Sequence, residues 1–317
     1  VSYRMSDVHY IFHGLGKDAS KGQIERSLSN FQFFADNPDA WIGDGLKGDQ
    51  RMRYAMDWGN SKVPEHKFKL VEEVIKNYDL DGLELDFMRH TIRFNPTRTD
   101  KDARVKIMTD FVARVRKTLD EKAKDSGKHI WLCLRIPGYR DSFDEAGVDI
   151  KALSAAGVDM FNLSNYYLCD MQMEIGEIRA LAPDKAFYAE IHFVNANGPF
   201  ENGHLQQKRA EPAQMRTIAH MAYARGAQGV SFFNFPYHRG TFDKSIAPSH
   251  SQDPQTLPPF EIFKELKDPA FLAAQPQYYA VGKTYNTPRH TGRPFHKTPA
   301  LNQTETIKLD MAPPTDG

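Results

Sequence analysis

The stretch that most constrains the fold is Asp79–His90, which reads Asp-Leu-Asp-Gly-Leu-Glu-Leu-Asp-Phe-Met-Arg-His. An amphipathic helical pattern over residues 63–77 leads into it, and the turn residues up to Gly82 break that helix. Three apolar residues then alternate with Glu84 and Asp86, which predicts a strand. Alternate residues of a strand share a face, so the two acids point the same way, with α-carbons roughly 6.5–7 Å apart. The other face is apolar and must be covered, as helices cover a parallel sheet.

Composition narrows the possible partners. The chain has 317 residues, 40% of them hydrophobic and 12% aromatic, which is ample for one large core. Lys+Arg and Asp+Glu both number 41, so net charge gives no support for a nucleic-acid groove or an anionic membrane surface. No apolar run approaches the roughly 20 residues of a membrane helix. Cys133 and Cys169 are too few for a disulfide framework or a thiolate zinc cluster.

The chain reads as strands alternating with helices. Helical patterns are expected over residues 63–77, 103–123, 149–155, 173–181 and 212–225. Strands are expected over residues 2–10, 53–58, 83–87, 129–136, 158–167, 185–193 and 229–235, and a long polar loop over 195–203. Near-continuous apolar strands joined through helices favour a parallel sheet.

This order predicts an α/β protein with a (β/α)8 TIM barrel. The roughly 30 to 45 residues between strands suit that fold, whose usual length is about 250 residues. A doubly wound sheet is the alternative, but no glycine-rich phosphate turn follows the first strand. Seven strands are one short of eight. Because the first begins at Ser2, we expect the missing strand upstream of Val1.

The last part of the chain has a different composition. Past Phe263 it is rich in proline, and Thr304–Leu309 reads as a lone strand. We therefore expect a barrel domain over residues 1–270. Residues 271–317 would be a linker and the start of a truncated β-rich domain, which makes the chain a fragment of something longer.

Polar residues gather where the predicted strands end, and in a TIM barrel the site lies at those carboxyl ends. Acids fall on two well-separated strands and are accompanied by Arg, His, Asn and aromatic side chains. Carboxylates protonate and attack at an anomeric centre, aromatics stack on sugar faces, and amides and guanidinium groups bond hydroxyls. The candidate catalytic residues are Asp86, Glu84 and Glu190. The candidate substrate-binding residues are Arg4, Asp7, His9, Arg89, His90, Arg135, Asn165, Tyr167, His192 and Asn234.

Two runs also carry a resemblance. Asp81–His90 looks like the fourth-strand signature of a group of uncharacterised, glycoside-hydrolase-like bacterial proteins, and Arg4–His9 is similar to an earlier strand of that group. More distantly, the Asp-Gly-three residues-Asp-two residues-basic-His spacing resembles the fourth strand of the α-amylase family. That resemblance implies that Asp86 is a nucleophile and that the protein is a secreted or periplasmic bacterial polysaccharide hydrolase.

The chain departs from both glycosidase patterns. The strand that ends at Arg135 lacks the acid/base glutamate that an amylase carries there. The Asn-Glu pair of the large retaining β-glycosidase clan is also absent, although Glu190 falls on the strand where that clan keeps its nucleophile. The assignment of acid and nucleophile therefore stays open.

Structural interpretations of the same residues remain open too. Asp81, before a glycine, fits a turn between helix and strand. Glu84 could be a buried acid paired with arginine. Arg135 could be the counter-ion of Glu84 or Asp86. Cys133 fits a buried, inert thiol.

Two other functions are compatible with these residues. One is a metal-dependent barrel hydrolase with Asp86, Glu190, His192 and His9 as ligands, but no His-x-His pair lies near these acids. The other is a barrel that binds glycans without cleaving them. We expect a carbohydrate substrate, no cofactor and no metal.

Hydrolysis requires one protonated and one charged carboxyl group. Asp86, beside Arg89 and within reach of Arg135, is expected to stay charged, and Glu190 or Glu84, in a drier position, is the candidate acid. Asp86→Asn is expected to abolish turnover while leaving the melting temperature nearly intact.

Overall fold

The computed structural model describes residues 1–5, 32–43, 53–88, 91–165, 171–201, 204–235, 259–279 and 311–312. The chain divides into two compact units, the first over Val1–Phe161 and the second beginning at Asn162. Each unit is described by itself.

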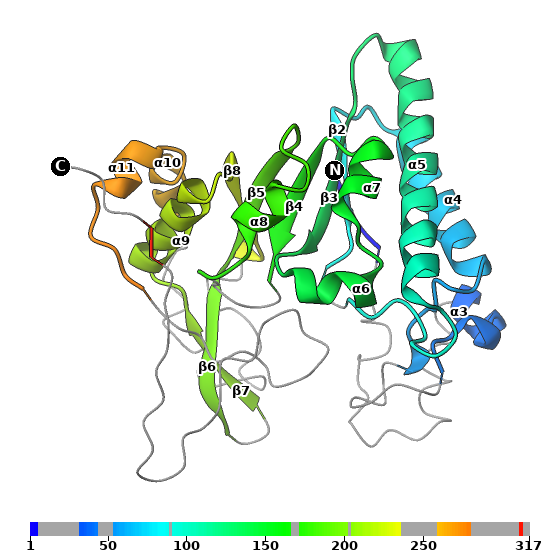
Figure 1. Ribbon diagram of the computed structural model, residues 1–317, viewed down its shortest axis with the longest axis horizontal. Helices are drawn as coiled ribbons and strands as arrows, with labels where there is room; N and C mark the ends of the chain where they lie inside the picture. Colours follow the sequence, from blue (N-terminus) through cyan, green and yellow to red (C-terminus); the bar gives the residue numbers. More distant parts are fainter. Residues whose placement is uncertain are drawn as a thin grey trace. The chain divides into compact units, whose positions relative to one another are not determined.

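Three parallel strands form the sheet of the first unit (Figure 1): β1 (Ser2–Arg4), β2 (Gly82–Asp86) and β3 (Trp131–Pro137). The strand predicted around Glu84 and Asp86 is therefore confirmed. β2 lies between the other two, so each of its side chains has a neighbour on both sides.

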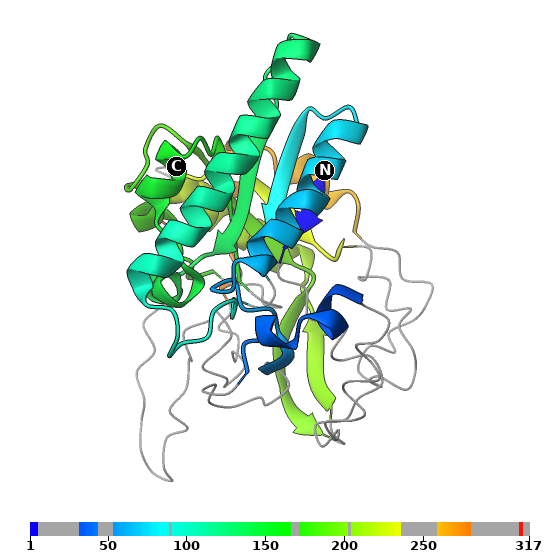
Figure 2. The same ribbon diagram turned by 90° about the vertical axis from the view of Figure 1, so that its right-hand side faces the viewer.

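Two long helices lie side by side in this unit (Figures 1 and 2): α4 (Lys62–Asn77) and α5 (Lys101–Ser126). The apolar residues at positions 83 and 85 of β2 and at position 87, just after it, are buried. Trp58 lies edge-on to both Phe87 of the sheet and Phe111 of α5, with ring centroids 5.7 and 5.0 Å apart. The expected helical cover of the apolar sheet face is thus present.

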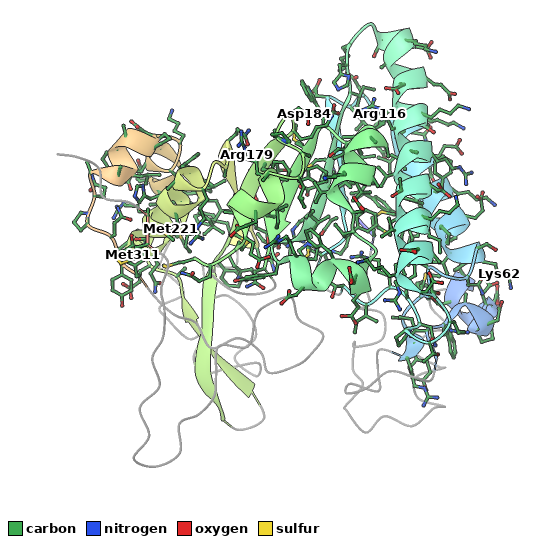
Figure 3. All side chains as sticks on the ribbon, viewed as in Figure 1. Lys62, Arg116, Arg179, Asp184, Met221 and Met311 are labelled. Atoms are coloured by element: carbon green, nitrogen blue, oxygen red, sulfur yellow. The ribbon has the colours of Figure 1, made fainter. Side chains whose placement is uncertain are left out.

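Arg116 of α5 ties this helix to the start of β3 (Figure 3). Its Nη1 donates to the Ile130 carbonyl at 2.9 Å and lies 3.3 Å from the Asp159 carboxylate. Asp159 in turn accepts the backbone N–H of Leu132 at 2.8 Å. Gly157 has φ +96°, and a Cβ there would lie 2.5 Å from Arg116 Cγ, so this turn requires glycine.

Short helices complete the first unit. They are α3 (Gln32–Asp36), η1 (Pro38–Ala40), η3 (Arg140–Ser142), α6 (Phe143–Ala146) and α7 (Ile150–Ala155).

The strands of the second unit follow the order β4-β5-β8, and β5 and β8 are parallel. Their bounds are Met160–Ser164 for β4, which begins just before the unit boundary, Ala186–His192 for β5 and Gly229–Phe233 for β8. The helices are α8 (Ile175–Arg179), α9 (Pro212–Ala224), α10 (Ile262–Glu265) and α11 (Pro269–Ala273).

An apolar core joins one face of these strands to the helices. Ile191 of β5 packs with Met215 and Ile218 of α9, Ile262 of α10 and Leu272 of α11. The polar residues of β5 alternate with this apolar set and therefore lie on the opposite face. Both units thus contain parallel strands with a helix-covered apolar face, which confirms the α/β class. Closure into an eight-stranded barrel and the C-terminal β-domain stay predictions.

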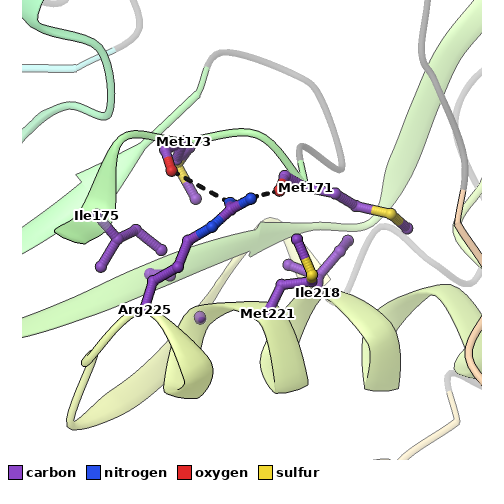
Figure 4. Close-up of a pocket in the computed structure, with 8 residues that line it drawn as sticks. Met171, Met173, Ile175, Ile218, Met221 and Arg225 are labelled. Atoms are coloured by element: carbon purple, nitrogen blue, oxygen red, sulfur yellow. Dashed lines mark hydrogen bonds between the residues drawn. The ribbon is translucent and has the colours of Figure 1, made fainter. Parts of the chain in front are cut away.

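A small pocket lies on the helix-covered side of β5 (Figure 4). Arg225, at the end of α9, spans it and donates to the carbonyls of Met171 and Met173 at 2.6 and 3.3 Å. The lining is otherwise thioether and aliphatic: Met171, Met173, Ile175, Ala189, Ile218, Met221 and Ala222. Because Ala189 faces it, this pocket is on the opposite side of β5 from Glu190.

Two sequence predictions are wrong. The loop expected over residues 195–203 is contradicted over residues 195–201, which belong to β6 (Val194–Glu201), and β6 pairs antiparallel with β7 (His204–Arg209). A register irregularity between Ala196 and Phe200 accommodates the Asn, Gly and Pro residues that argued against a strand. Residues 53–58 form no strand of the parallel sheet, and Met56 makes an isolated antiparallel bridge to Trp41.

The lone strand predicted over Thr304–Leu309 lies outside the described residues. The expected domain division at residue 270 falls within α11 and stays a prediction. Among the residues that the structure describes, no helix combines the length and apolarity needed to cross a bilayer.

Candidate active site

Asp86 lies between two arginines in the first unit. Arg4, Asp86 and Arg135 occupy the same register position on β1, β2 and β3. Arg135 Nη1 donates to Asp86 Oδ1 at 2.7 Å, and Arg4 Nε lies 3.7 Å from Asp86 Oδ2. Asp86 and Arg135 are each only 4% exposed, so this ion pair is shielded from water. The interpretation of Arg135 as the counter-ion of Asp86 fits this geometry.

The backbone also holds Asp86 in place. Its Oδ1 accepts the N–H of Met88, two residues further on, at 2.9 Å. Such a side-chain bond to the following backbone competes with strand pairing. It marks the end of β2, so the carboxylate sits at the carboxyl end of the strand.

Glu84 lies on the same face of β2 as Asp86, two residues earlier, and is beside Ser2 and Cys133 in register. Ser2 Oγ donates to Glu84 Oε1 at 2.6 Å, and the buried Cys133 thiol lies 3.5 Å from Oε2. The side chain of Glu84 is partly exposed whereas Asp86 is buried. The expectation that Glu84 is the drier of the two acids is therefore wrong.

Arg93 fixes the segment that follows Asp86. Its guanidinium, which is buried, donates to the carbonyls of Phe87 and Ala146 and lies 4.9 Å from the Phe87 ring. Burial lowers the pKa of Arg93 to about 9, while the charges of Asp86 and Glu145 act in the opposite direction. Arg93 was not among the candidate residues drawn from the sequence, and this bracing role was not foreseen.

A hydrogen-bond network of the buried residues Asp57 and Asn95 with the exposed Arg98 anchors the loop between β2 and α5. Asp57 Oδ1 accepts the backbone N–H of Asn95 at 3.1 Å, and its Oδ2 lies 2.9 Å from Arg98 Nη2. Asn95 and Arg98 both donate to the Ile42 carbonyl, at 2.7 and 2.8 Å. The Arg98 guanidinium contacts both the Asp57 carboxylate and the Ile42 carbonyl. The positive charge in this oxygen-rich cluster is therefore that of an arginine side chain.

Glu190 is the candidate catalytic carboxylate of the second unit. It is 4% exposed and lies on the face of β5 opposite the helices. Ser164 of β4 donates its hydroxyl to Glu190 Oε1 at 2.6 Å. Ser231 of β8 pairs with Glu190 in register and donates to Asn162 Oδ1 at 3.0 Å. The face around Glu190 is therefore lined by hydroxyl and amide groups.

Other predicted residues of the second unit lie at the same strand ends. His192 is buried two residues after Glu190, with its ring centroid 4.7 Å from that of Phe193 and 5.5 Å from that of Phe233. Asn165, just after β4, is also buried. Asn234 follows β8 with φ 56°, a left-handed conformation that asparagine tolerates.

The structure brings Arg4, Asp86 and Arg135 together, with Glu84 on the same face. Glu190 and His192 share a second face. Five predicted residues lie outside the described residues: Asp7, His9, Arg89, His90 and Tyr167. Ser164 was not among the predicted site residues, although alternation along β4 places it on the same face as Asn162.

Within the described ranges, no three His, Cys, Asp or Glu side chains come together in a way that could hold a metal ion. His9, which the metal-dependent alternative uses as a ligand, lies outside the described residues.

The comparisons with known proteins found similarity to solved structures. No protein-family model and no curated protein matches the chain. A glycoside hydrolase family 18 N-acetylglucosaminidase from Paenibacillus barengoltzii aligns at 12% identity over 56% of this chain and 72% of that one, with a TM-score of 0.39. The GH53 catalytic domain of Ignisphaera aggregans aligns at 13% identity over 74% of both chains, with a TM-score of 0.37.

A cycloisomaltooligosaccharide glucanotransferase from Paenibacillus sp. aligns at 16% identity over 45% of this chain and 20% of that one, with a TM-score of 0.32. Two of these three neighbours are glycoside hydrolases. At such low similarity they carry no argument about chemistry, which has to come from the side chains of this protein.

Proposed function

We propose that this protein is a glycoside hydrolase that cleaves a poly- or oligosaccharide with paired carboxylates at the carboxyl ends of TIM-barrel strands. One observation supports this most. Asp86 and Glu190 are buried acids on strand faces opposite the helices, and each accepts hydrogen bonds that fix its orientation. Catalytic carboxylates need such fixed positions, because a small displacement from the productive geometry lowers the rate steeply.

The proposed reaction follows the two-carboxylate scheme. A protonated acid gives its proton to the glycosidic oxygen as the bond from that oxygen to the anomeric carbon breaks. A charged carboxylate either bonds to the anomeric carbon, to be displaced later by water, or takes a proton from an attacking water. Asp86 is proposed as a charged carboxylate because the cations Arg135 and Arg4 flank it. The proton donor is sought among the remaining acids, Glu84 and Glu190.

The substrate is proposed to be anionic, such as a uronate or sulfated polymer. Arg4 and Arg135 adjoin the proposed reacting carboxylate, and guanidinium groups bind carboxylates and sulfates well. We also propose, from the resemblance of the sequence, that the protein is bacterial and works outside the cytoplasm. The barrel domain is proposed to span residues 1–270.

The test is cleavage of a panel of neutral and anionic polysaccharides, followed by the appearance of new reducing ends. Wild type should cleave at least one polymer, and Asp86→Asn should not. Asp110→Asn is the matched control, because Asp110 is an exposed acid of α5 in an i,i+4 pair with Lys106. Binding without cleavage by wild type would favour the glycan-binding alternative. Loss of cleavage after chelation would favour the metal-dependent one.

A further inference from the structure

Ser164 and Glu190 form a hydrogen bond in which both partners are buried. The Ser164 hydroxyl lies 2.6 Å from Glu190 Oε1, and the two residues are 0% and 4% exposed. A hydroxyl that donates to a charged carboxylate typically lies about 2.5–2.7 Å from it. The distance therefore fits a serine O–H donating to a carboxylate.

We infer that Ser164 is a positioning residue that keeps Glu190 in its charged form, so that Glu190 acts as nucleophile or base and not as proton donor. The catalytic role rests on the proposed hydrolysis, but the effect of Ser164 on the charge of Glu190 does not. A hydrogen bond donated to the charged form of a carboxyl group favours that form, whereas burial without a donor favours the neutral form. Glu190 is buried, so the hydroxyl of Ser164 counteracts the effect of burial and favours the charged form.

Among the described residues, few neighbours of Glu190 on its own face are titratable. Tyr188 and His192 flank it on β5, while the described neighbours Asn162 of β4 and Ser231 and Phe233 of β8 do not titrate. The helix α9 packs on the opposite face of β5. Its titratable residues are Arg216, which pairs with Glu265, His220, and Tyr223, which donates to the Leu266 carbonyl; Arg225, just after the helix, donates to the Met171 carbonyl.

This assignment narrows the search for the acid. If Glu190 is charged, the proton for the leaving oxygen must come from another group. Of the two acids considered above, this leaves Glu84, which itself accepts a hydroxyl hydrogen bond from Ser2 at 2.6 Å. Glu190 and Asp86 are then both candidates for the charged carboxylate that acts as nucleophile or base.

The test is a carboxyl ¹³C NMR titration of the full chain labelled at glutamate, with the Glu190 resonance assigned from Glu190→Gln. Ser164→Ala should move the titration midpoint of Glu190 to higher pH by about one unit, the size expected for one bond to a charged group. Ser164→Cys keeps the shape of the side chain, with a somewhat larger terminal atom, but offers a weak donor, so it should shift the midpoint the same way. Ser154→Ala is the control, because that hydroxyl bonds the Ile150 carbonyl on α7, and it should leave the midpoint unchanged.

Three results would overturn the inference. They are an unchanged or lowered midpoint in Ser164→Ala, a wild-type midpoint in Ser164→Cys, and an equal shift in Ser154→Ala. If Ser164→Ala does not fold, Ser164→Cys decides. A second measurement separates this inference from the proposed function. On any polymer that is cleaved, the acid limb of the kcat/KM profile of Ser164→Ala should move to higher pH. Failure of wild type to cleave any polymer would count against hydrolysis and leave the NMR result standing.

Discussion

Asp86 and Arg135 lie side by side on neighbouring parallel strands. Arg135 Nη1 donates to Asp86 Oδ1 at 2.7 Å, and both residues are almost completely removed from solvent. Removing a charge from water is costly, and a buried ion pair offsets that cost only while both partners are present. Changes at either residue therefore affect both the stability of the first unit and the chemistry of the candidate site.

Replacement of Arg135 tests the stability part of this relationship. Arg135→Met removes the cation and leaves the Asp86 charge buried, so the free energy of unfolding should fall by about 3–5 kcal/mol in urea titrations. Lys101→Met is the control. Lys101 pairs with Asp144 at 2.8 Å with both side chains more than half exposed, so removal of this pair should change the free energy of unfolding far less. Equal effects of the two substitutions would show that the Asp86–Arg135 pair contributes no more than a surface pair.

Replacement of Asp86 tests the chemistry. Asp86→Asn should lower kcat by about 10²–10⁴-fold, the usual contribution of a positioned catalytic carboxyl group. The buried pair changes one expectation drawn from the sequence. Asparagine leaves the Arg135 charge without its counter-ion, so the melting temperature should fall rather than stay nearly intact. Kinetics must therefore be measured well below the melting temperature of the variant. Turnover at a tenth of the wild-type rate would mean that Asp86 is structural.

Arg4 tests the charge of the substrate. Its side chain is 35% exposed, so it can reach a ligand while it stays close to Asp86. Arg4→Gln should lower kcat/KM about tenfold on a uronate or sulfated polymer, the equivalent of one charge-assisted hydrogen bond. The effect on a neutral polymer should be much smaller, and added salt should reduce the difference. Equal losses on both polymers would indicate that Arg4 serves Asp86 and not the substrate.

His66 of α4 predicts a pH dependence of stability. Its ring stacks on Phe33 of α3, with centroids 3.8 Å apart. Burial, and then the charges of Lys67 and Lys69, lower the pKa of His66. The neutral ring therefore contributes stability that is present above the unfolded pKa of about 6.5 and is lost as pH falls through the lower folded pKa. His66→Phe keeps the stacking without a titrating group.

Calorimetry from about pH 7 to pH 5 checks this prediction. The melting temperature of wild type should fall more steeply with acidification than that of His66→Phe. Parallel curves would show that protonation of His66 does not weaken the packing of α3 on α4.

Much of the framework follows from the sequence. The helix predicted over residues 103–123 is α5, Lys101–Ser126, because its apolar spacing is regular and Asp100 caps it by accepting the N–H of Ala103. The strand around Asp86 was also predicted, since alternation of acids with apolar residues leaves little choice of conformation. The same alternation also predicted which face of β2 the helices cover.

The remaining features depend on residues far apart in the chain. Ser164 and Glu190 are separated by 26 positions, and their bond appears only once β4 and β5 are adjacent. Arg93 looks like any basic residue near a strand end until Phe87 and Ala146 turn their carbonyls toward it. The segment of residues 195–201 has poor strand propensity, and pairing with β7 overrides that propensity.

The hairpin β6–β7 has a consequence for how this protein can diversify. Val194 pairs with Arg209, and Ala210 donates to the Phe193 carbonyl at 2.8 Å, so the two chain ends of the hairpin are joined to each other at its base. Its length and tip can therefore change without moving His192 on one side or α9 on the other. We expect the fold to tolerate a grafted or shortened hairpin. Selection can then change the residues near β5 while the strands that carry the acids keep their positions.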